Sequence, residues 1–480
     1  MLRRRLGPFD SVMMMVGLVI GSGIYLTTGI MADTLPSVPL IMAAWLVGGL
    51  LTLAGALTCA ELGALLPEAG GLYVFLREAW GSLAGFLFGW LLFLVTMSGS
   101  VAALAVAFAE YLGRFLPALS PERTLLTIIP GGAGGAGGWS ISAGQLAAVG
   151  LIVVLTAYNY RGVRPGAVLQ NVLTVIKIGT LVALGVIGLS FGRAEPVDLA
   201  LNPAGLGLSD LLTGFGVALI AVSWAFDGWN NITYVAGEIR DPGRNLPLAL
   251  IGGTLLITLL YLLANAVFVR ALPLGEMAGV VPVAERAVSS LFGRAAGGVL
   301  TVLVLVSILG ALQGAVFAGP RVFYAMARDG FFFRRVGGVH PRFGTPAAAI
   351  VLQGAWSIVL TLSGTFEQLF TFVMFLTIAF WIAAAAAVFT LRRTMPDAPR
   401  PYRTWGYPAV PILFILASLA LMVNTLINRP LESLAGIGLA LVGLPVYAWW
   451  RKQRQQALSS LGLQPDTDIP QNGENPDAAQ

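Results

Sequence analysis

The chain has 480 residues, of which 57% are hydrophobic even before its 59 glycines are counted, and only 11% are charged. Globular domains are about 45–50% apolar with glycine included and about 25% charged, so a water-soluble fold is excluded and we expect an integral membrane protein. The net charge of +5 would suggest nucleic acid in a soluble protein. Here we attribute it to basic residues on one side of a bilayer and expect no nucleic-acid partner.

Apolar runs of about 18 or more residues are long enough to cross a bilayer as helices. Twelve such runs occur, at approximately 11–33, 38–66, 82–112, 143–160, 167–190, 210–236, 247–270, 296–322, 346–362, 366–391, 408–427 and 433–450. The short alternating segments of a membrane barrel are absent. The predicted fold class is therefore all-α, an integral membrane protein with 12 transmembrane helices.

The distribution of basic residues predicts how these helices are oriented. Of the 28 basic residues, twenty lie in segments on the same side as the N-terminus, seven lie on the other side, and Lys177 lies inside a span. Basic loops remain cytoplasmic, so residues 1–10 are predicted to be a cytoplasmic N-terminus and 451–480 a disordered cytoplasmic tail. We expect a multi-pass protein of the cell membrane, plasma or inner, whose first helix is retained.

Two of the spans are interrupted near mid-membrane. Span 1 contains Gly21-Ser22-Gly23 and span 6 contains Asp227-Gly228. Close helix packing would explain the glycines, and a helix cap would explain the aspartate. Interruptions five spans apart instead favour an inverted-repeat transporter, with repeat one at 11–190, repeat two at 210–391, and helices 11 and 12 at 408–450 outside the repeat.

Interrupted helices offer free backbone groups to a ligand at the membrane midplane. N–H groups at one helix end attract a carboxylate, and carbonyl groups at another attract an ammonium, so a zwitterion satisfies both. In span 1 the candidate donors are the N–H groups of Ser22, Gly23 and Ile24. In span 6 the candidate acceptors are the carbonyls of Trp224, Ala225 and Phe226.

Three segments carry a family resemblance: GLVIGSGIY at 17–25, WAFDGWNNITYVAGEIRDPGRNLP at 224–247 and GPRVFYAMARDGFF at 319–332. In them the chain resembles the L-type amino acid transporter branch of the amino acid–polyamine–organocation superfamily. This implies a leucine-transporter-type 5+5 inverted repeat with broken helices 1 and 6, plus two C-terminal helices. It also implies amino acid transport by alternating access.

The resemblance also implies roles for individual residues. The substrate carboxylate is expected on Gly21, Ser22, Gly23 and Ile24. The amino group is expected on Trp224, Ala225, Phe226, Asp227 and Gly228, with the ring of Trp224 closing over bound substrate. Trp229 and Asn230 are interpreted as structural supports, and the charged Arg240, Asp241 and Arg244 as gating or surface residues of the adjoining loop.

Lys177 lies ten residues inside span 5, too deep for its side chain to reach either interface easily. The resemblance implies that its ammonium replaces a bound sodium ion, resting on carbonyls of span 1 near span 8, and hence that transport is sodium-independent. A hydroxyl is expected beside it on span 8. Residues 308–319 contain no Ser or Thr, which leaves Ser307 as the candidate.

Several alternatives of function stay open at this stage. We favour exchange of neutral L-amino acids, while Asp227 and Lys177 leave a proton-coupled permease, or a cationic amino acid or polyamine permease, as the alternative. A channel and a membrane enzyme are remote alternatives, because no filter motif occurs and His340 is the only histidine.

We expect no metal site, no cofactor and no enzymatic activity. Cys59 is the single cysteine and lies in an apolar run, so the outside loop at 113–142 has none. No disulfide-linked heavy chain is therefore expected as a partner. The sequence GGAGGAGG at 131–138 is interpreted as a flexible connector.

Overall fold

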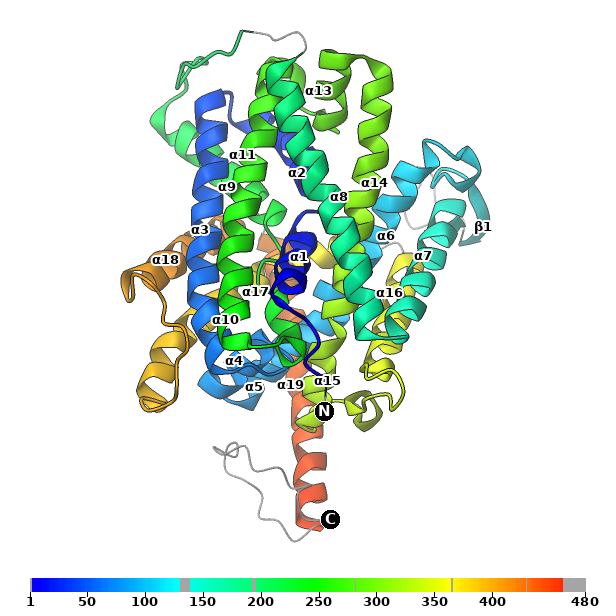
Figure 1. Ribbon diagram of the computed structural model, residues 1–480, viewed down its shortest axis with the longest axis vertical. Helices are drawn as coiled ribbons and strands as arrows, with labels where there is room; N and C mark the ends of the chain where they lie inside the picture. Colours follow the sequence, from blue (N-terminus) through cyan, green and yellow to red (C-terminus); the bar gives the residue numbers. More distant parts are fainter. Residues whose placement is uncertain are drawn as a thin grey trace.

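The computed structural model describes residues 2–129, 139–191, 196–280, 282–363, 366–428 and 430–460. Figure 1 shows a bundle of helices that run mostly along its long axis, with one small hairpin at its side. The first half contains α1 (Pro8–Val19), α2 (Gly23–Thr34), α3 (Val38–Leu65), α4 (Leu72–Trp80), α5 (Ser82–Leu91), the π-helix η1 (Leu92–Thr96), α6 (Met97–Gly113), the 3-10 turn η2 (Pro117–Leu119), β1 (Thr124–Ile129), β2 (Trp139–Ser142), α7 (Ala143–Tyr160) and α8 (Val163–Ser190).

The second half begins with α9 (Leu208–Ala225), which is followed by the 3-10 helix η3 (Asn231–Glu238). Next come α10 (Pro242–Pro247), the π-helix η4 (Leu248–Gly252), α11 (Gly253–Ala271), α12 (Leu274–Met277), α13 (Val283–Phe292), α14 (Arg294–Ala318) and α15 (Pro320–Arg328). The chain continues through the 3-10 turn η5 (Arg334–Gly337), α16 (Ala347–Ser363), α17 (Phe366–Thr394), α18 (Ala409–Asn428) and α19 (Pro430–Ser460).

The described residues contain eleven helical stretches that are long and apolar enough to cross a membrane, and Ala347–Ser363 is a shorter apolar helix of 17 residues. Together they correspond to the twelve predicted spans. The prediction of an all-α membrane fold is therefore confirmed, while the 5+5 inverted repeat stays a prediction.

The structure also differs from the prediction in three places. The loop at 113–142 contains the antiparallel pair β1 and β2, although its glycine-rich residues 131–138 lie outside the described residues. The short helices α4 and α13, which connect spans, were not predicted because they are amphipathic and too short to cross a bilayer. The prediction of a disordered tail from 451 was wrong for residues 451–460, because these good helix formers extend α19 to Ser460; residues 461–480 lie outside the described part.

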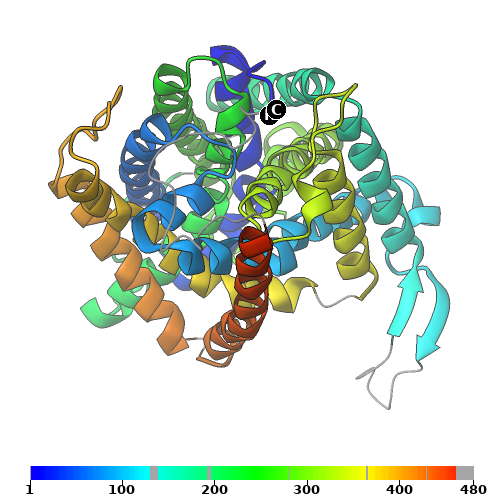
Figure 2. The same cartoon turned by 90° about the horizontal axis from the view of Figure 1, so that it is seen from below.

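The first span occupies the middle of the bundle. Helix α1 contacts α8, α14 and α11, and Figure 1 shows it between α11 and α8. Figure 2 looks along the bundle from below and shows α18 and α19 on its periphery. The interruption in the first span is therefore placed where several other spans can contact it.

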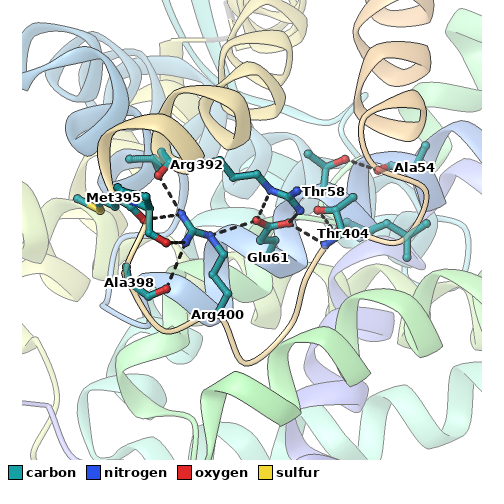
Figure 3. Close-up of polar contacts among 11 residues, drawn as sticks. Ala54, Thr58, Glu61, Arg392, Met395, Ala398, Arg400 and Thr404 are labelled. Atoms are coloured by element: carbon teal, nitrogen blue, oxygen red, sulfur yellow. Dashed lines mark hydrogen bonds and ion pairs between the residues drawn. The ribbon is translucent and has the colours of Figure 1, made fainter.

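A buried carboxylate fastens α3 to the end of α17 and to the connector before α18 (Figure 3). Glu61 is 1% exposed and accepts hydrogen bonds from Nε and Nη2 of Arg392 at 2.8 and 2.7 Å, and from the backbone N–H of Thr404 at 2.7 Å. Nε of Arg400 lies 3.5 Å from the same carboxylate. The remaining Arg400 donors cover carbonyl oxygens at the end of α17, including those of Leu391 and Met395. We refer to Glu61, Arg392 and Arg400 as the Glu61 cluster.

Candidate functional site

The first span is broken where its sequence is richest in glycine. Helix α1 ends at Val19, Ile20 has an extended backbone (φ −71°, ψ 94°), and α2 begins at Gly23. The first N–H groups of a helix have no carbonyl partner within it. The N–H groups of Gly23 and Ile24 at the start of α2 are therefore free to bind an anion.

The sixth span is broken around Asp227. Helix α9 ends at Ala225, and the chain then turns through Gly228, whose φ of +93° favours glycine. It continues as the 3-10 helix η3 rather than as an α-helix. Asp227 is half-buried at this turn, and its backbone N–H donates to the carbonyl of Trp224 at 3.1 Å.

The two breaks lie against each other. A Cβ placed on Gly23 would lie 2.9 Å from Cα of Ala225, and one on Gly228 would lie 3.0 Å from the carbonyl oxygen of Leu18. Only residues without a side chain permit this approach. The structure thus brings the predicted carboxylate donors of span 1 beside the predicted ammonium acceptors of span 6.

The carbonyl groups in span 6 are partly engaged by the protein itself. The Ala225 carbonyl accepts a hydrogen bond from the hydroxyl of Tyr261 at 3.1 Å, and the Trp224 carbonyl accepts from Asp227. A carbonyl has two acceptor positions, so each can still accept a ligand donor. The side chain of Trp224 is 36% exposed, whereas that of Phe226 is only 1% exposed.

Lys177 reaches the break in span 1 from α8. Its Nζ donates to the carbonyls of Ile20 at 2.6 Å and Gly17 at 2.9 Å, and the residue is 1% exposed. Ser307 on α14 donates to the Gly21 carbonyl at 3.1 Å and lies 3.4 Å from that of Ile20. One ammonium and one hydroxyl therefore cover the carbonyls that the end of α1 leaves without helical partners.

The space for this ammonium depends on Gly310 of α14. A Cβ at that position would lie 2.5 Å from Cε and 2.7 Å from Nζ of Lys177. Any larger residue would displace the ammonium from the span 1 carbonyls.

Tyr261 on α11 is a site residue that sequence reasoning missed. Its hydroxyl lies 3.1 Å from the carbonyl of Ala225 and 3.4 Å from that of Val19, so it connects the ends of both broken helices. Its ring packs edge-on against Phe226 and Trp45, with centroids 5.0 and 5.4 Å apart. Its only sequence signal was a hydroxyl inside an apolar run.

A second missed group lies one turn further along these helices. The hydroxyl of Thr28 on α2 hydrogen-bonds the side-chain carbonyl of Asn265 on α11, and the Trp45 indole donates to the same hydroxyl at 3.3 Å. Thr28 and Asn265 are fully buried. They fix α2 against α11 next to the break.

The start of the chain binds the segment that follows η3. Leu6 forms a parallel β-bridge with Ile239, directly after η3, and the N–H groups of Arg5 and Leu6 both donate to the carbonyl of Glu238. The Glu238 carboxylate pairs with Arg321 of α15 at 2.8 Å, and both side chains are at most 1% exposed. Nearby Arg240, Asp241 and Arg244, which we considered for gating, are exposed on the surface.

A second ion pair at this end joins α4 to the segment after α15. Arg77 contacts Asp329, which also accepts a hydrogen bond from the hydroxyl of Tyr73 at 2.7 Å. Burial disfavours the charged guanidinium, but Asp329, Tyr73 and Glu78 more than offset this and raise the pKa of Arg77 above its ordinary value. Arg77 therefore stays charged and holds the two segments together.

Among the described residues, no group of three or more His, Cys, Asp or Glu side chains is arranged to hold a metal ion. The polar groups at the breaks are backbone N–H and carbonyl groups, one ammonium, the carboxylate of Asp227 and a few hydroxyls. This donor set suits an organic zwitterion.

The comparison with known proteins decides the family. A family model described as amino acid permease matches residues 6–441. The chain belongs to the amino acid permease family. The resemblance seen in the three sequence segments is confirmed, and the protein is a membrane transporter of amino acids rather than an enzyme.

Three relatives span nearly the whole chain. The serine/threonine exchanger SteT of Bacillus subtilis is 31% identical over 459 residues, which cover 94% of this chain and 98% of SteT. The b(0,+)-type amino acid transporter 1 of Mus musculus is 28% identical, covering 89% and 84% of the two chains. The human large neutral amino acids transporter small subunit 2 is 29% identical, covering 93% and 80%.

Proposed function

We propose that this permease is a sodium-independent exchanger of neutral L-amino acids. The substrate binds between the broken helices, with its carboxylate on the N–H groups of Ser22, Gly23 and Ile24 and its ammonium on the carbonyls of Trp224, Ala225 and Phe226. Gly21 and Gly228 allow the backbone to approach the ligand, and Trp224 closes over it. The close approach of the two breaks supports this arrangement.

The observation that carries the proposal is the position of the Lys177 ammonium. A sodium ion at a break in a helix is held by backbone carbonyls and hydroxyl oxygens. In this chain Lys177 occupies the carbonyls of Gly17 and Ile20, and the hydroxyl of Ser307 adjoins it. A covalently attached cation here makes a dissociable one unnecessary.

Exchange of neutral substrates is supported by the relatives. SteT is named as a serine/threonine exchanger and the human relative as a transporter of large neutral amino acids. The broken helices contact only the groups common to all amino acids, so the rest of the pocket sets the preference among side chains. Asp227, which lies at the turn, is assigned a role in shaping the break.

Uptake by purified protein in liposomes tests the proposal. Initial rates should be equal in sodium and choline media, and internal amino acid should stimulate them. Methyl esters and decarboxylated amines should not be carried, because each lacks one of the two charged groups. Steep dependence on external sodium, or uptake of the esters, would contradict it.

Substitution of Lys177 directly tests the role assigned to its ammonium. Lys177→Ala leaves two carbonyls without a charged donor, each such bond being worth about 1.5–3 kcal/mol. Transport should fall at least about tenfold, the equivalent of about 1.4 kcal/mol, while the protein remains folded. Lys452→Ala is the matched control, since the only other lysine is exposed on α19. Unchanged kinetics of Lys177→Ala would remove the support for the proposal.

A substitution of Asp227 tests whether the substrates are neutral or cationic amino acids. Asp227→Asn should leave uptake of neutral amino acids measurable and create no selective defect in arginine or lysine uptake. Selective loss of the cationic substrates would instead assign the carboxylate to recognition of a positive side chain, and would favour a cationic permease.

We also infer the membrane arrangement. The excess of basic residues on the side of the N-terminus supports cytoplasmic termini in the cell membrane. Cys59 is buried in α3, which supports function without a disulfide-linked heavy chain. Labelling of cysteines introduced into either terminus, from one side of sealed vesicles, tests the orientation.

A further inference from the structure

The hairpin between α6 and α7 exposes a cluster of apolar side chains. Strand β1 reads TLLTII, and all six of its residues are exposed. Leu125, Leu126, Ile128 and Ile129 are each between 42% and 56% exposed. The pairing with β2 shifts register between Thr124 and Leu126 and again between Thr127 and Ile129. The paired positions place Leu126 and Ile129 on one face of the hairpin and Thr124 and Thr127 on the other, so the described part of β1 has an apolar face and a hydroxyl face.

This surface is continuous with a surface that faces lipid. Strand β2 leads directly into α7, where Ser142 caps the helix by accepting from the N–H of Gln145. Leu146, Val153 and Val154 are 48%, 49% and 62% exposed on α7, which crosses the membrane. The bilayer therefore covers α7 immediately next to the hairpin.

The direction of the hairpin places it against the same bilayer. In Figure 1 β1 lies at the side of the bundle next to α7, below the upper ends of α8 and α14. In Figure 2 the two strands extend outward from the bundle, beyond α7. A hairpin that extends sideways at the end of two spans lies along the membrane rather than projecting into water.

The charged residues and the backbone groups near β1 indicate how deeply the hairpin inserts into the bilayer. Between Phe115 and Ile129 the only charged residues are Glu122 and Arg123, both before β1. Among the described residues, β1 pairs only with β2 and its other edge has no strand partner. The N–H and carbonyl groups of that edge need water, which the hydrocarbon core lacks. The boundary between headgroups and acyl chains provides apolar contact for the side chains and water for the backbone.

We propose that this hairpin is a membrane-interface anchor, inserted into the leaflet on the side of the membrane opposite the described chain ends. Its occupant is lipid. The exposed apolar surface of α7, which adjoins the hairpin and crosses the membrane, supports lipid as the occupant, and the hydroxyl face of β1 is directed to the headgroups. The anchor fixes the connection between α6 and α7 relative to the bilayer plane.

Site-directed spin labelling in proteoliposomes tests the anchor. In a Cys59→Ala background, Leu126→Cys places a nitroxide on the apolar face of β1 and Thr127→Cys places one on the hydroxyl face. Collision with oxygen, which concentrates in lipid, is compared with collision with a water-soluble nickel chelate. Val154→Cys on α7 gives the lipid reference, and Glu276→Cys on exposed α12 gives the water reference. Retained amino acid uptake shows that each labelled protein is folded.

The label at 126 should show an oxygen-to-nickel collision ratio several-fold above that at position 276, and the label at 127 should show a lower ratio than the label at 126. Equal ratios at 126 and 276 would place the hairpin in water and overturn the proposal. Exclusion of both reagents at 126 would also overturn it, because a protein partner or a second copy would then cover the strand. A ratio at 127 equal to or above that at 126 would likewise contradict an anchor that lies on its apolar face.

Discussion

The Glu61 cluster makes a quantitative stability prediction. Glu61→Gln keeps the shape of the side chain but removes its charge, and so leaves Arg392 and Arg400 without their carboxylate. Breaking a buried ion pair on one side costs about 3–5 kcal/mol. Because the Arg392 side chain is 25% exposed, water compensates in part, and we expect the lower end, about 3 kcal/mol.

The loss converts into a measurable shift. With about 2.1 cal/mol/K of unfolding entropy per residue, a chain of this length loses about 1 °C of Tm per kcal/mol, so Glu61→Gln should lower Tm by about 3 °C. Intrinsic fluorescence of purified protein during heating measures this. Glu68→Gln is the matched control, because that carboxylate is 61% exposed and lies 3.5 Å from Arg77; it should change stability by less than about 1 kcal/mol.

A double substitution tests whether the charge imbalance is the cause. Arg392→Gln in the Glu61→Gln background removes the unpaired cation, and should recover part of the lost Tm rather than add a further loss. A Glu61→Gln protein as stable as the wild type, or strictly additive losses in the double variant, would refute the reasoning.

Two further predictions concern the helix breaks. Gly310→Ala should reduce transport at least about tenfold by pushing the ammonium of Lys177 off its carbonyls, whereas Gly298→Ala, where a Cβ meets nothing within 4 Å, should leave uptake unchanged; equal rates for the two variants would disprove this. Tyr261→Phe removes one hydroxyl that binds the Ala225 carbonyl, a loss of about 1 kcal/mol that should lower Tm by about 1 °C, and KM should rise because the break is held less firmly. An unchanged KM would show that the hydroxyl does not position the break.

The transmembrane helices were predictable because the length and composition of an apolar run alone specify a span. The break in span 1 was equally predictable, since Gly21 and Gly23 weaken a helix whatever its surroundings. Lys177 stood out because a cation inside an apolar run needs a protein partner. Each of these signals is local in the sequence.

The remaining features depend on contacts between distant segments. Glu61 and Arg392 are separated by 331 residues, and nothing in either neighbourhood indicates that they pair. Tyr261 looks like an ordinary aromatic residue until its hydroxyl is placed between two helix ends. The β1 strand carries a β-forming sequence in TLLTII, but the glycine-rich segment beside it suggested a featureless connector.

The β-bridge between Leu6 and Ile239 can form only after about half of the chain has been synthesised. The chain is made from its N-terminus at about 5–20 residues per second, so the roughly 230 residues between the two strands take roughly 10–50 s to appear. During that interval the N–H groups of Arg5 and Leu6 lack the Glu238 carbonyl that they bind in the finished protein. A nascent chain that stalls before Ile239 therefore cannot form this bridge, even if its first five spans are already in the membrane.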